Sequence, residues 1–321
     1  MEFYDSLEAV PASFGPSAVA IGKFDGVHSG HRSVISTLVG LARAEGLAAT
    51  ALTFDRHPLS LLRPEACPLQ LLSNAQRVER LADTGLDATV MVAFDEKFSA
   101  LAPEEFVATI LVKTLRARTV LVGSDFRFGA RGAGTVETLR ELGAKHGFEV
   151  RGIDDVVALG SERRASSTWV RELLSAGDVA TAATVLGYTP TIRAEVVHGV
   201  QRGREMGYPT ANLSPQIEGF IPADGVYAAW FTVDGSRFGA AVSIGNNPTF
   251  DGVPEKQVEA HVLDEKLDLY DRRVEVSFVE YIRGMHKFSG MAALSEQMVR
   301  DEDRIREVLG YSPRGSVQPR P

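Results

Sequence analysis

The sequence predicts two fold classes in succession: an α/β domain built on a mostly parallel sheet, and then a small antiparallel β-barrel with a C-terminal helix. In the first half, apolar runs typical of buried strands alternate with stretches of helical spacing, which favours a parallel sheet with helices on both faces. Near residue 187 the pattern changes to short, evenly spaced strands with glycine, proline and Asp-Gly turns, as in a small barrel. We therefore expect domains at residues 1–186 and 187–310 and a flexible tail at 311–321.

The first half begins with an apolar strand at Ser17–Ile21. A helix should start at or near His31, because apolar residues recur at helical spacing from Val34 to Ala42. Further strands are predicted at Leu47–Phe54, Ala88–Ala93, Thr119–Val122 and Phe148–Ile153. Helices are predicted at Asn74–Asp83, Pro103–Thr114, Thr135–His146 and Val179–Leu186. Ligands of such sheets bind beyond the carboxyl ends of the strands, so functional residues should follow the strands.

The second half has the alternating pattern of barrel strands. The predicted strands are Thr191–His198, Gly225–Val233, Phe238–Ile244, Gln257–Val262 and Arg273–Tyr281. An amphipathic helix at Met291–Leu309 is expected to cap the barrel.

The composition of the 321 residues excludes several classes of protein. A formal net charge of −8 argues against a broad nucleic-acid surface, because such surfaces rely on clustered Lys and Arg. The single cysteine, Cys67, excludes an internal disulfide and a cysteine-rich metal site. No apolar run approaches about 18 residues, and the first residues lack the layout of a signal peptide. We expect a cytoplasmic protein without membrane or nucleic-acid partners.

Two histidines surround a glycine where the first strand gives way to a helix. A helix N-terminus offers unpaired backbone N–H groups, and the glycines at 22, 26 and 30 allow an anion to approach the backbone closely. His28 and His31 are therefore predicted to bind a nucleotide phosphate. In the alternative interpretation, either histidine only caps the helix or packs against the sheet.

A second candidate segment runs from Arg163 to Arg171. Its hydroxyl residues, Ser166, Ser167 and Thr168, are favourable helix caps whatever else they do. Arg164 and Arg171 flank them and offer two guanidiniums to a polyphosphate.

The barrel half contains a glycine-rich segment at 199–212. Its three glycines recur at intervals of four, so backbone amides could face phosphates, although a glycine-rich hairpin is the simpler interpretation. Thr210 and Asn212 alternate in an extended segment and so face the same side, where their oxygens could share one Mg²⁺.

These segments together resemble the bacterial bifunctional riboflavin kinase/FAD synthetases. The matching stretches are GKFDGVHSGH at 22–31, VGSDFRFG at 122–129, RRASSTWVR at 163–171 and GVQRGREMGYPTAN at 199–212. The resemblance implies that residues 1–186 form a Rossmann-like nucleotidyltransferase domain with FMN adenylyltransferase activity, and that 187–310 form a riboflavin kinase domain. Riboflavin and ATP would give FMN, and FMN and a second ATP would give FAD and pyrophosphate, both steps with Mg²⁺.

The resemblance also assigns residues to the adenylyltransferase site. For ATP these are Gly22, Phe24, Asp25, Gly26, His28, Gly30, His31, Arg164, Ser167, Thr168 and Arg171. For the flavin they are Asp55, His57, Pro58, Asp125, Phe126 and Phe128. Of the ATP set, His28, His31, Arg164 and Arg171 are the catalytic candidates, because they would stabilise charge on the phosphates.

The kinase site is assigned in the same way. For ATP its residues are Gly199, Gly203, Arg204, Gly207, Pro209, Thr210 and Asn212, with Thr210 and Asn212 also as metal ligands. For the flavin they are Tyr227, Asn246, Glu259 and Arg300. The resemblance implies that Glu259 is the catalytic base of the kinase reaction.

The chain departs from the family pattern at several positions. Arg56 stands where proline is usual, Ala165 where isoleucine is usual and Asn246 where threonine is usual. Asp271 replaces a glycine, and we expect the fold to hold because Asp adopts the left-handed conformation at modest cost. Two alternatives remain: a chain that retains only one of the two activities, and a non-enzymatic flavin- or RNA-binding module. The sequence leaves the oligomeric state open.

Overall fold

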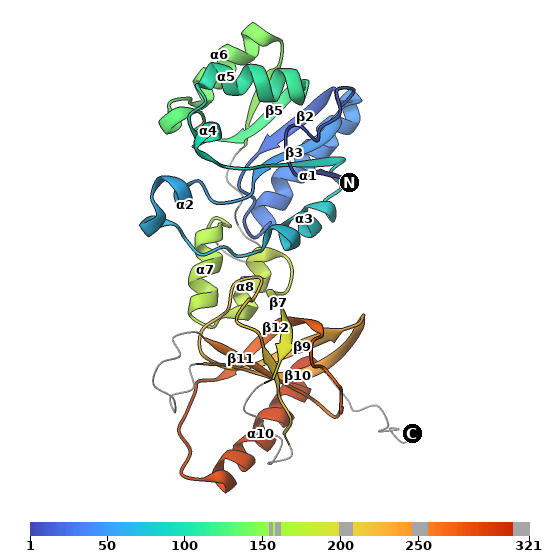
Figure 1. Cartoon of the computed structure of the whole chain (residues 1–321), viewed down its shortest axis with the longest axis vertical. Helices are drawn as coiled ribbons and strands as arrows, with labels where there is room; N and C mark the ends of the chain where they lie inside the picture. The colour runs from blue at the N-terminus through green and yellow to red at the C-terminus, as the bar shows by residue number, and fades with distance from the viewer. Residues whose placement is uncertain (154–156, 158–161, 199–207, 246–255, 311–321) are drawn as a thin grey trace. The chain divides into compact units, whose positions relative to one another are not determined.

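The computed structural model describes residues 1–153, 157, 162–198, 208–245 and 256–310. The chain divides into two compact units, Met1–Ser167 and Thr168–Pro321, called here the first and second unit. The first unit is an α/β domain and the second contains a closed barrel, as predicted (Figure 1). The two units meet between Ser167 and Thr168, so residues 168–186, which we assigned to the first domain, belong to the second unit. The predicted boundary between the two functional domains, after residue 186, stays a prediction.

The first unit is built on a six-stranded sheet whose paired strands all run parallel. Its strands are β1 (Glu2–Tyr4), β2 (Ser17–Ile21), β3 (Ala48–Phe54), β4 (Ala88–Val92), β5 (Ala117–Gly123) and β6 (Glu149–Ile153). They lie in the order β1-β4-β3-β2-β5-β6. The four central strands are almost wholly buried, which explains their continuous apolar runs.

Helices cover the sheet. They are α1 (Ser29–Glu45), α2 (Leu59–Leu62), η1 (Pro64–Ala66), α3 (Asn74–Ala82), α4 (Glu96–Ser99), α5 (Pro103–Phe106), the π-helix η2 (Val107–Thr114), η3 (Ala130–Gly132) and α6 (Val136–His146). On one face, Val19 and Ile21 of β2 join a core cluster with residues of α5, η2 and α6. The alternate residues of β2, Ala18 and Ala20, point to the other face because side chains alternate along a strand. Helix α1 packs against β2 and β3.

The strand order reverses at β2. From β2 the chain continues outward to β3 and β4 on one side, and β5 and β6 lie on the other. Such a switch leaves a crevice beyond the carboxyl ends of the two strands, where open α/β sheets bind their ligands. The segments that follow β2 and β5 therefore flank the expected ligand position.

The second unit contains a closed barrel with the strand order β10-β11-β8-β7-β12-β9. The strands are β7 (Thr191–Val197), β8 (Ala211–Leu213), β9 (Gly225–Val233), β10 (Ser236–Gly245), β11 (Gln257–Val262) and β12 (Arg273–Arg283). Two helices, α7 (Ser167–Ser175) and α8 (Val179–Leu186), precede the barrel, and α8 packs against β12. All the paired barrel strands are antiparallel, as predicted.

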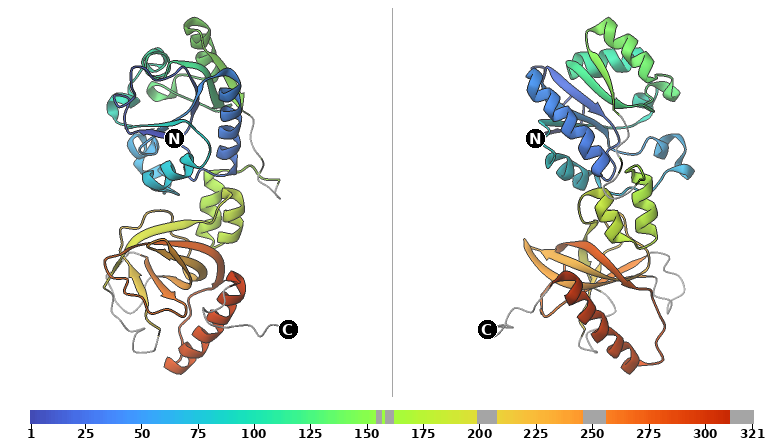
Figure 2. Two further views of the ribbon diagram at one scale, coloured as in Figure 1. Left: turned by 90° about the vertical axis from the view of Figure 1, so that its right-hand side faces the viewer. Right: turned by 180° about the vertical axis from the view of Figure 1, so that it is seen from behind.

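The C-terminal helix α10 (Met291–Leu309) lies along the outside of the barrel (Figure 2). Its buried residue Ile305 packs with Ala228 and Leu263. Strand β11 alternates in burial, with Val258 buried and Glu259 half-buried, so Glu259 and His261 point to the same outer side of the strand.

The sequence pattern missed short elements, among them β1 and α4, because three or four residues are too few to show a period. Asp271 has φ +59°, so it takes the left-handed conformation expected of it. The predicted tail at 311–321 lies outside the described residues. Within the described part of the chain, no helix is long and apolar enough to cross a membrane.

Candidate active sites

The loop after β2 forms a tight turn that leads into α1. Phe24, Gly26 and Val27 all have positive φ, at +48°, +82° and +36°. His28 then caps α1: its Nδ1 accepts the backbone N–H of His31 at 3.4 Å. The two imidazole rings stack, with centroids 3.7 Å apart and planes at 21°. His28 is thus a helix cap, and the same geometry sets a histidine pair at the N-terminus of α1.

The electrostatics of the loop favour a neutral His31. Burial lowers the pKa of His31 well below its ordinary value, and the neighbouring His28, Lys23 and Arg164 act in the same direction. Nδ1 of His31 is buried and has no hydrogen-bond partner among the described residues. A neutral imidazole keeps one donor and one acceptor for a ligand.

The segment 164–167 lies against this loop, as a shared phosphate site requires. The Ser167 hydroxyl donates to the backbone carbonyl of Asp25 at 2.8 Å. A Cβ at Gly30 would lie 3.1 Å from the ring of His28 and 3.4 Å from the Ala165 carbonyl, so glycine permits the close approach of the His28 ring, with Ala165 at ordinary contact distance. The Asp25 carboxylate accepts the N–H of Leu71 at 3.0 Å, which gives it a structural role in holding the loop. Thr168 and Arg171 lie on α7, in the second unit.

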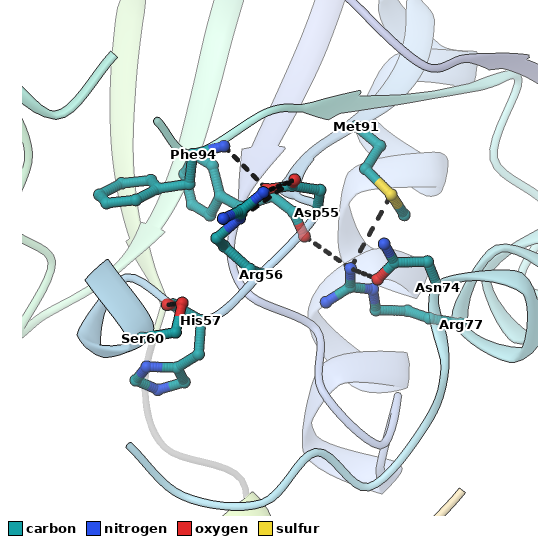
Figure 3. Close-up of polar contacts among 9 residues, drawn as sticks. Asp55, Arg56, His57, Ser60, Asn74, Arg77, Met91 and Phe94 are labelled. Atoms are coloured by element: carbon teal, nitrogen blue, oxygen red, sulfur yellow. Dashed lines mark hydrogen bonds and ion pairs between the residues drawn. The ribbon is translucent and has the colours of Figure 1, made fainter. Parts of the chain in front are cut away.

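The turn after β3 contacts the same loop. His57 accepts the N–H of Leu59 through Nδ1 at 3.1 Å, and its Nε2 lies 3.0 Å from Nζ of Lys23. Asp55 accepts the N–H of Phe94 at 2.8 Å and pairs with Arg56 at 3.1 Å (Figure 3). Pro58 directly precedes the short helix α2, so the turn forms despite the unusual Arg56. Lys23 is a cation in this region that the sequence reasoning did not select.

The segment after β5 holds three of the predicted flavin residues, Asp125, Phe126 and Phe128. Phe128 is 6% exposed, belongs to the main core and packs against Phe106. Phe126 stacks on Phe128 with centroids 5.7 Å apart and is only partly buried. Asp125 is exposed. Of the two phenylalanines, Phe126 is therefore the one with surface left for a planar ligand.

A second cluster lies on the barrel, around Glu259. The Thr210 hydroxyl donates to Oε2 of Glu259 at 3.5 Å. Glu259 pairs in register with Asn212 of β8 on one side and Ser243 of β10 on the other. Burial raises the pKa of Glu259, and the Thr210 hydrogen bond only partly opposes this. A carboxylate of raised pKa is a stronger base, which suits proton abstraction.

A mostly apolar pocket lies beside this cluster. Thr210 and Pro209 line it together with residues of β7, β8, β11 and the segment 265–270, among them Val196, Ala211 and Leu267. Pockets lined mainly by apolar side chains with a few polar groups are typical of small-molecule sites.

Comparison with known proteins identifies the family. A family model described as FAD synthetase matches residues 11–168, and one described as riboflavin kinase matches residues 186–309. The bifunctional riboflavin kinase/FMN adenylyltransferase of Escherichia coli (strain K12) is 36% identical over 295 residues, which cover 92% of this chain and 93% of the relative. The chain belongs to this bifunctional family. It is a transferase that converts riboflavin to FMN and FMN to FAD.

Two further relatives extend the comparison. The bifunctional riboflavin kinase/FMN adenylyltransferase of Listeria monocytogenes is 35% identical over 291 residues, covering 90% of this chain and 91% of its own length. A crystal structure titled as a macrolide-efflux protein from Streptococcus pneumoniae has a TM-score of 0.85 and 31% identity. That match covers 97% of this chain and 99% of the other, so the fold is shared over both domains.

Other predicted kinase residues make contacts of their own or lie outside the described residues. Tyr227 is fully buried and its hydroxyl donates to the Ala223 carbonyl at 2.6 Å, so it acts here as a core residue with no surface for a flavin. Arg300 lies on α10 and donates to Gln297 at 2.9 Å. The described residues do not include Gly199, Gly203, Arg204, Gly207 and Asn246.

His261 is a residue of this bifunctional enzyme that the sequence reasoning missed. It shares the outer side of β11 with Glu259, and its Nδ1 lies 2.9 Å from the Pro209 carbonyl. Its Nε2 lies 3.3 Å from the carboxylate of Glu302 on α10. Burial lowers the pKa of His261, but the bonds to Glu302 and Pro209 outweigh it, so the net shift is upward. A protonated His261 would bridge two acceptors.

The raised pKa of His261 predicts how the stability of the folded protein depends on pH. The contribution of His261 is fully present below its unfolded pKa of 6.5 and is lost as pH rises through the higher folded value. His261→Gln should therefore lower the melting temperature more at about pH 6 than at about pH 9. Thermal unfolding of both proteins at the two pH values measures this, and Glu302→Gln should show the same trend. An equal loss at both pH values would contradict it.

Proposed function

We propose that FMN is adenylylated at the loop between β2 and α1, and that riboflavin is phosphorylated at the Glu259 cluster. The observation that carries the first assignment is the stacked pair of His28 and His31 at the N-terminus of α1, at the switch point of a parallel sheet. Backbone N–H groups, imidazoles and the positive end of the helix dipole all favour phosphate there.

In the adenylylation step, a phosphate oxygen of FMN attacks the α-phosphorus of ATP and pyrophosphate leaves. No protein nucleophile is needed, so the residues act by positioning and by stabilising charge. His28, His31 and Arg164 would stabilise the negative charge. Ser167 would position the phosphates, and His57, Asp55 and Phe126 would contact the flavin.

In the phosphorylation step, Glu259 takes the proton of the 5′-hydroxyl of riboflavin while that oxygen attacks the γ-phosphorus of ATP, and ADP leaves. The half-buried position of Glu259 and its raised pKa support the role of base. The apolar pocket suits an adenine base, and Thr210, which lines it, also contacts Glu259, so the phosphates of ATP would lie near Thr210.

We also propose that Thr210 and Asn212 hold Mg²⁺ in the kinase domain. The fit is chemical: Thr210 Oγ1 lies 3.5 Å from a Glu259 carboxylate oxygen, and Asn212 faces Glu259 across the strand pair. These are hard oxygen donors of the kind Mg²⁺ prefers. When bound, Mg²⁺ offsets charge on the phosphates of ATP. We propose that adenylylation needs Mg²⁺ as well.

Two substitutions, one in each proposed site, test whether the two reactions occur at separate sites. Thr210→Ala should raise the Mg²⁺ concentration for half-maximal riboflavin phosphorylation by about tenfold or more, and leave FMN adenylylation unchanged. Arg164→Met should slow adenylylation by roughly tenfold or more, with phosphorylation unchanged, because one charged hydrogen-bond donor is lost. The two reactions are followed separately by chromatography of flavins. Loss of both activities in either variant would refute the assignment.

We further propose a cytoplasmic enzyme without a nucleic-acid partner. Its co-substrate, ATP, is a cytoplasmic metabolite, and its net charge of −8 disfavours binding to a polyanion.

A further inference from the structure

Arg77 is a buried arginine outside the predicted site residues. It lies on α3 and is 4% exposed. Its Nη1 donates to the backbone carbonyl of Lys23 at 3.0 Å. Its Nη2 donates to the carbonyl of Phe54 at 2.5 Å and to Oδ1 of Asn74 at 2.7 Å (Figure 3). One guanidinium therefore bridges the loop that follows β2 and the end of β3.

Both bridged segments bear residues of the proposed adenylylation site. Lys23 begins the loop that leads to His28 and contacts His57 through its side chain. Phe54 is the last residue of β3 and directly precedes Asp55. The Lys23 carbonyl also accepts the hydroxyl of Thr53 at 3.1 Å, so its position relative to β3 is fixed from two sides.

The loop needs such support because of its backbone. Phe24 and Val27 both have a left-handed conformation, at φ +48° and +36°. Residues with a Cβ persist there only where their surroundings hold them, and such strain is common at active sites. The segment that leads into α3 holds the loop at a second point, where Leu71 donates to the Asp25 carboxylate.

The positive charge of Arg77 also interacts with two nearby carboxylates. Burial lowers the pKa of Arg77, and the carboxylates of Asp25 and Asp55 act in the opposite direction. These two carboxylates belong to the same two segments that the guanidinium bridges. Charge and hydrogen bonds therefore tie the loop and the turn to one side chain.

We propose that Arg77 is a positioning residue for FMN adenylylation, because it aligns the loop of His28 and His31 with the turn of Asp55 and His57. The inference rests on the proposed adenylylation site. An in-line attack between two bound substrates is sensitive to their alignment, and a misplacement of about 1 Å can cost about 10²-fold in rate.

The test compares Arg77→Met and Arg77→Lys in the full-length enzyme. Arg77→Met should lower kcat for FMN adenylylation by about 10- to 100-fold, with a much smaller change in KM for ATP. Arg77→Lys should recover part of that loss, because an ammonium can reach one of the two carbonyls. Riboflavin phosphorylation, measured on the same samples, should remain unchanged and report intact protein.

Arg43→Met is the matched control. Arg43 is also an arginine of the first unit with a two-fold hydrogen bond, to Asp87 at 2.8 and 2.9 Å. Asp87 directly precedes β4, at the amino edge of the sheet, and Arg43 is exposed. This variant should keep the wild-type kcat for both reactions.

A wild-type adenylylation kcat in folded Arg77→Met would overturn the inference. If that variant does not fold, Arg77→Lys decides: unchanged adenylylation kinetics would overturn it, and a fall in kcat at unchanged KM for ATP would support it. His28→Ala distinguishes a failure of the proposed adenylylation site from a failure of the proposed role of Arg77. If His28→Ala keeps full adenylylation, the proposed site is wrong, whereas loss in His28→Ala with normal Arg77 variants refutes only the role of Arg77.

Discussion

His28→Ala is expected to slow FMN adenylylation by about 10²- to 10³-fold, the effect of removing one preorganised donor from a transition-state charge. Two losses combine in this variant. The imidazole that stacks on His31 at 3.7 Å disappears, and α1 loses the side chain that caps it. Initial rates of FAD formation from FMN and ATP measure the effect, and FMN affinity, measured by fluorescence quenching, should change far less.

His28→Asn serves as the control for folding. Asparagine is a good helix cap but has no imidazole, so it should restore the stability of α1 without restoring the rate. If His28→Asn recovers both, or if His28→Ala weakens FMN binding and turnover equally, then His28 acts on structure or on flavin binding and not on the transferred charge.

Glu259→Gln is expected to lower riboflavin phosphorylation by about 10²- to 10⁴-fold, because general-base catalysis contributes this much. Glutamine keeps the size of the side chain and an oxygen that can accept a hydrogen bond from the Thr210 hydroxyl. In the wild-type protein this hydroxyl lies 3.5 Å from Oε2 of Glu259. The substitution removes the negative charge of the carboxylate and with it the ability to take a proton. FMN adenylylation by the same variant should remain measurable, and chromatography of the flavins distinguishes the two reactions.

The pH dependence of the wild-type kinase reaction gives an independent check. Because burial raises the pKa of Glu259, the base becomes protonated, and kcat/KM falls, at a higher pH than for an ordinary carboxyl group. Retained turnover in Glu259→Gln would assign proton transfer to another group. A fall in kcat/KM only at the pH of an unshifted carboxyl would contradict the role of burial.

The sequence predicted the fold and the loop of His28 because both depend on local patterns. Periodicity locates strands such as Ser17–Ile21 to the residue, and glycines beside histidines mark a strand-to-helix switch. Glu259 has no such signal, since a glutamate on an alternating strand is usually a solvated surface residue. It was found by family resemblance alone, and its partner Thr210 lies 49 residues away in sequence.

Arg77 shows why other residues were missed. An arginine on a helix is usually exposed. The carbonyls of Lys23 and Phe54, which accept hydrogen bonds from Arg77, are 54 and 23 residues away in sequence. Backbone acceptors leave no trace in residue types, so no pattern indicates them. The same limit applied to Phe126 and Phe128, where the sequence could not tell which ring joins the core.

The open sheet of the first unit has consequences for association between copies of the enzyme. A closed barrel has no free strand edges, whereas β6 is an outer strand of the six-stranded sheet. Exposed outer strands invite pairing with other chains, and charged side chains discourage it. β6 has Glu149 and Arg151 on one side, paired at 2.9 Å, and Arg151 also reaches Glu45 of α1 at 3.4 Å. These charges protect the edge of the sheet against intermolecular strand pairing.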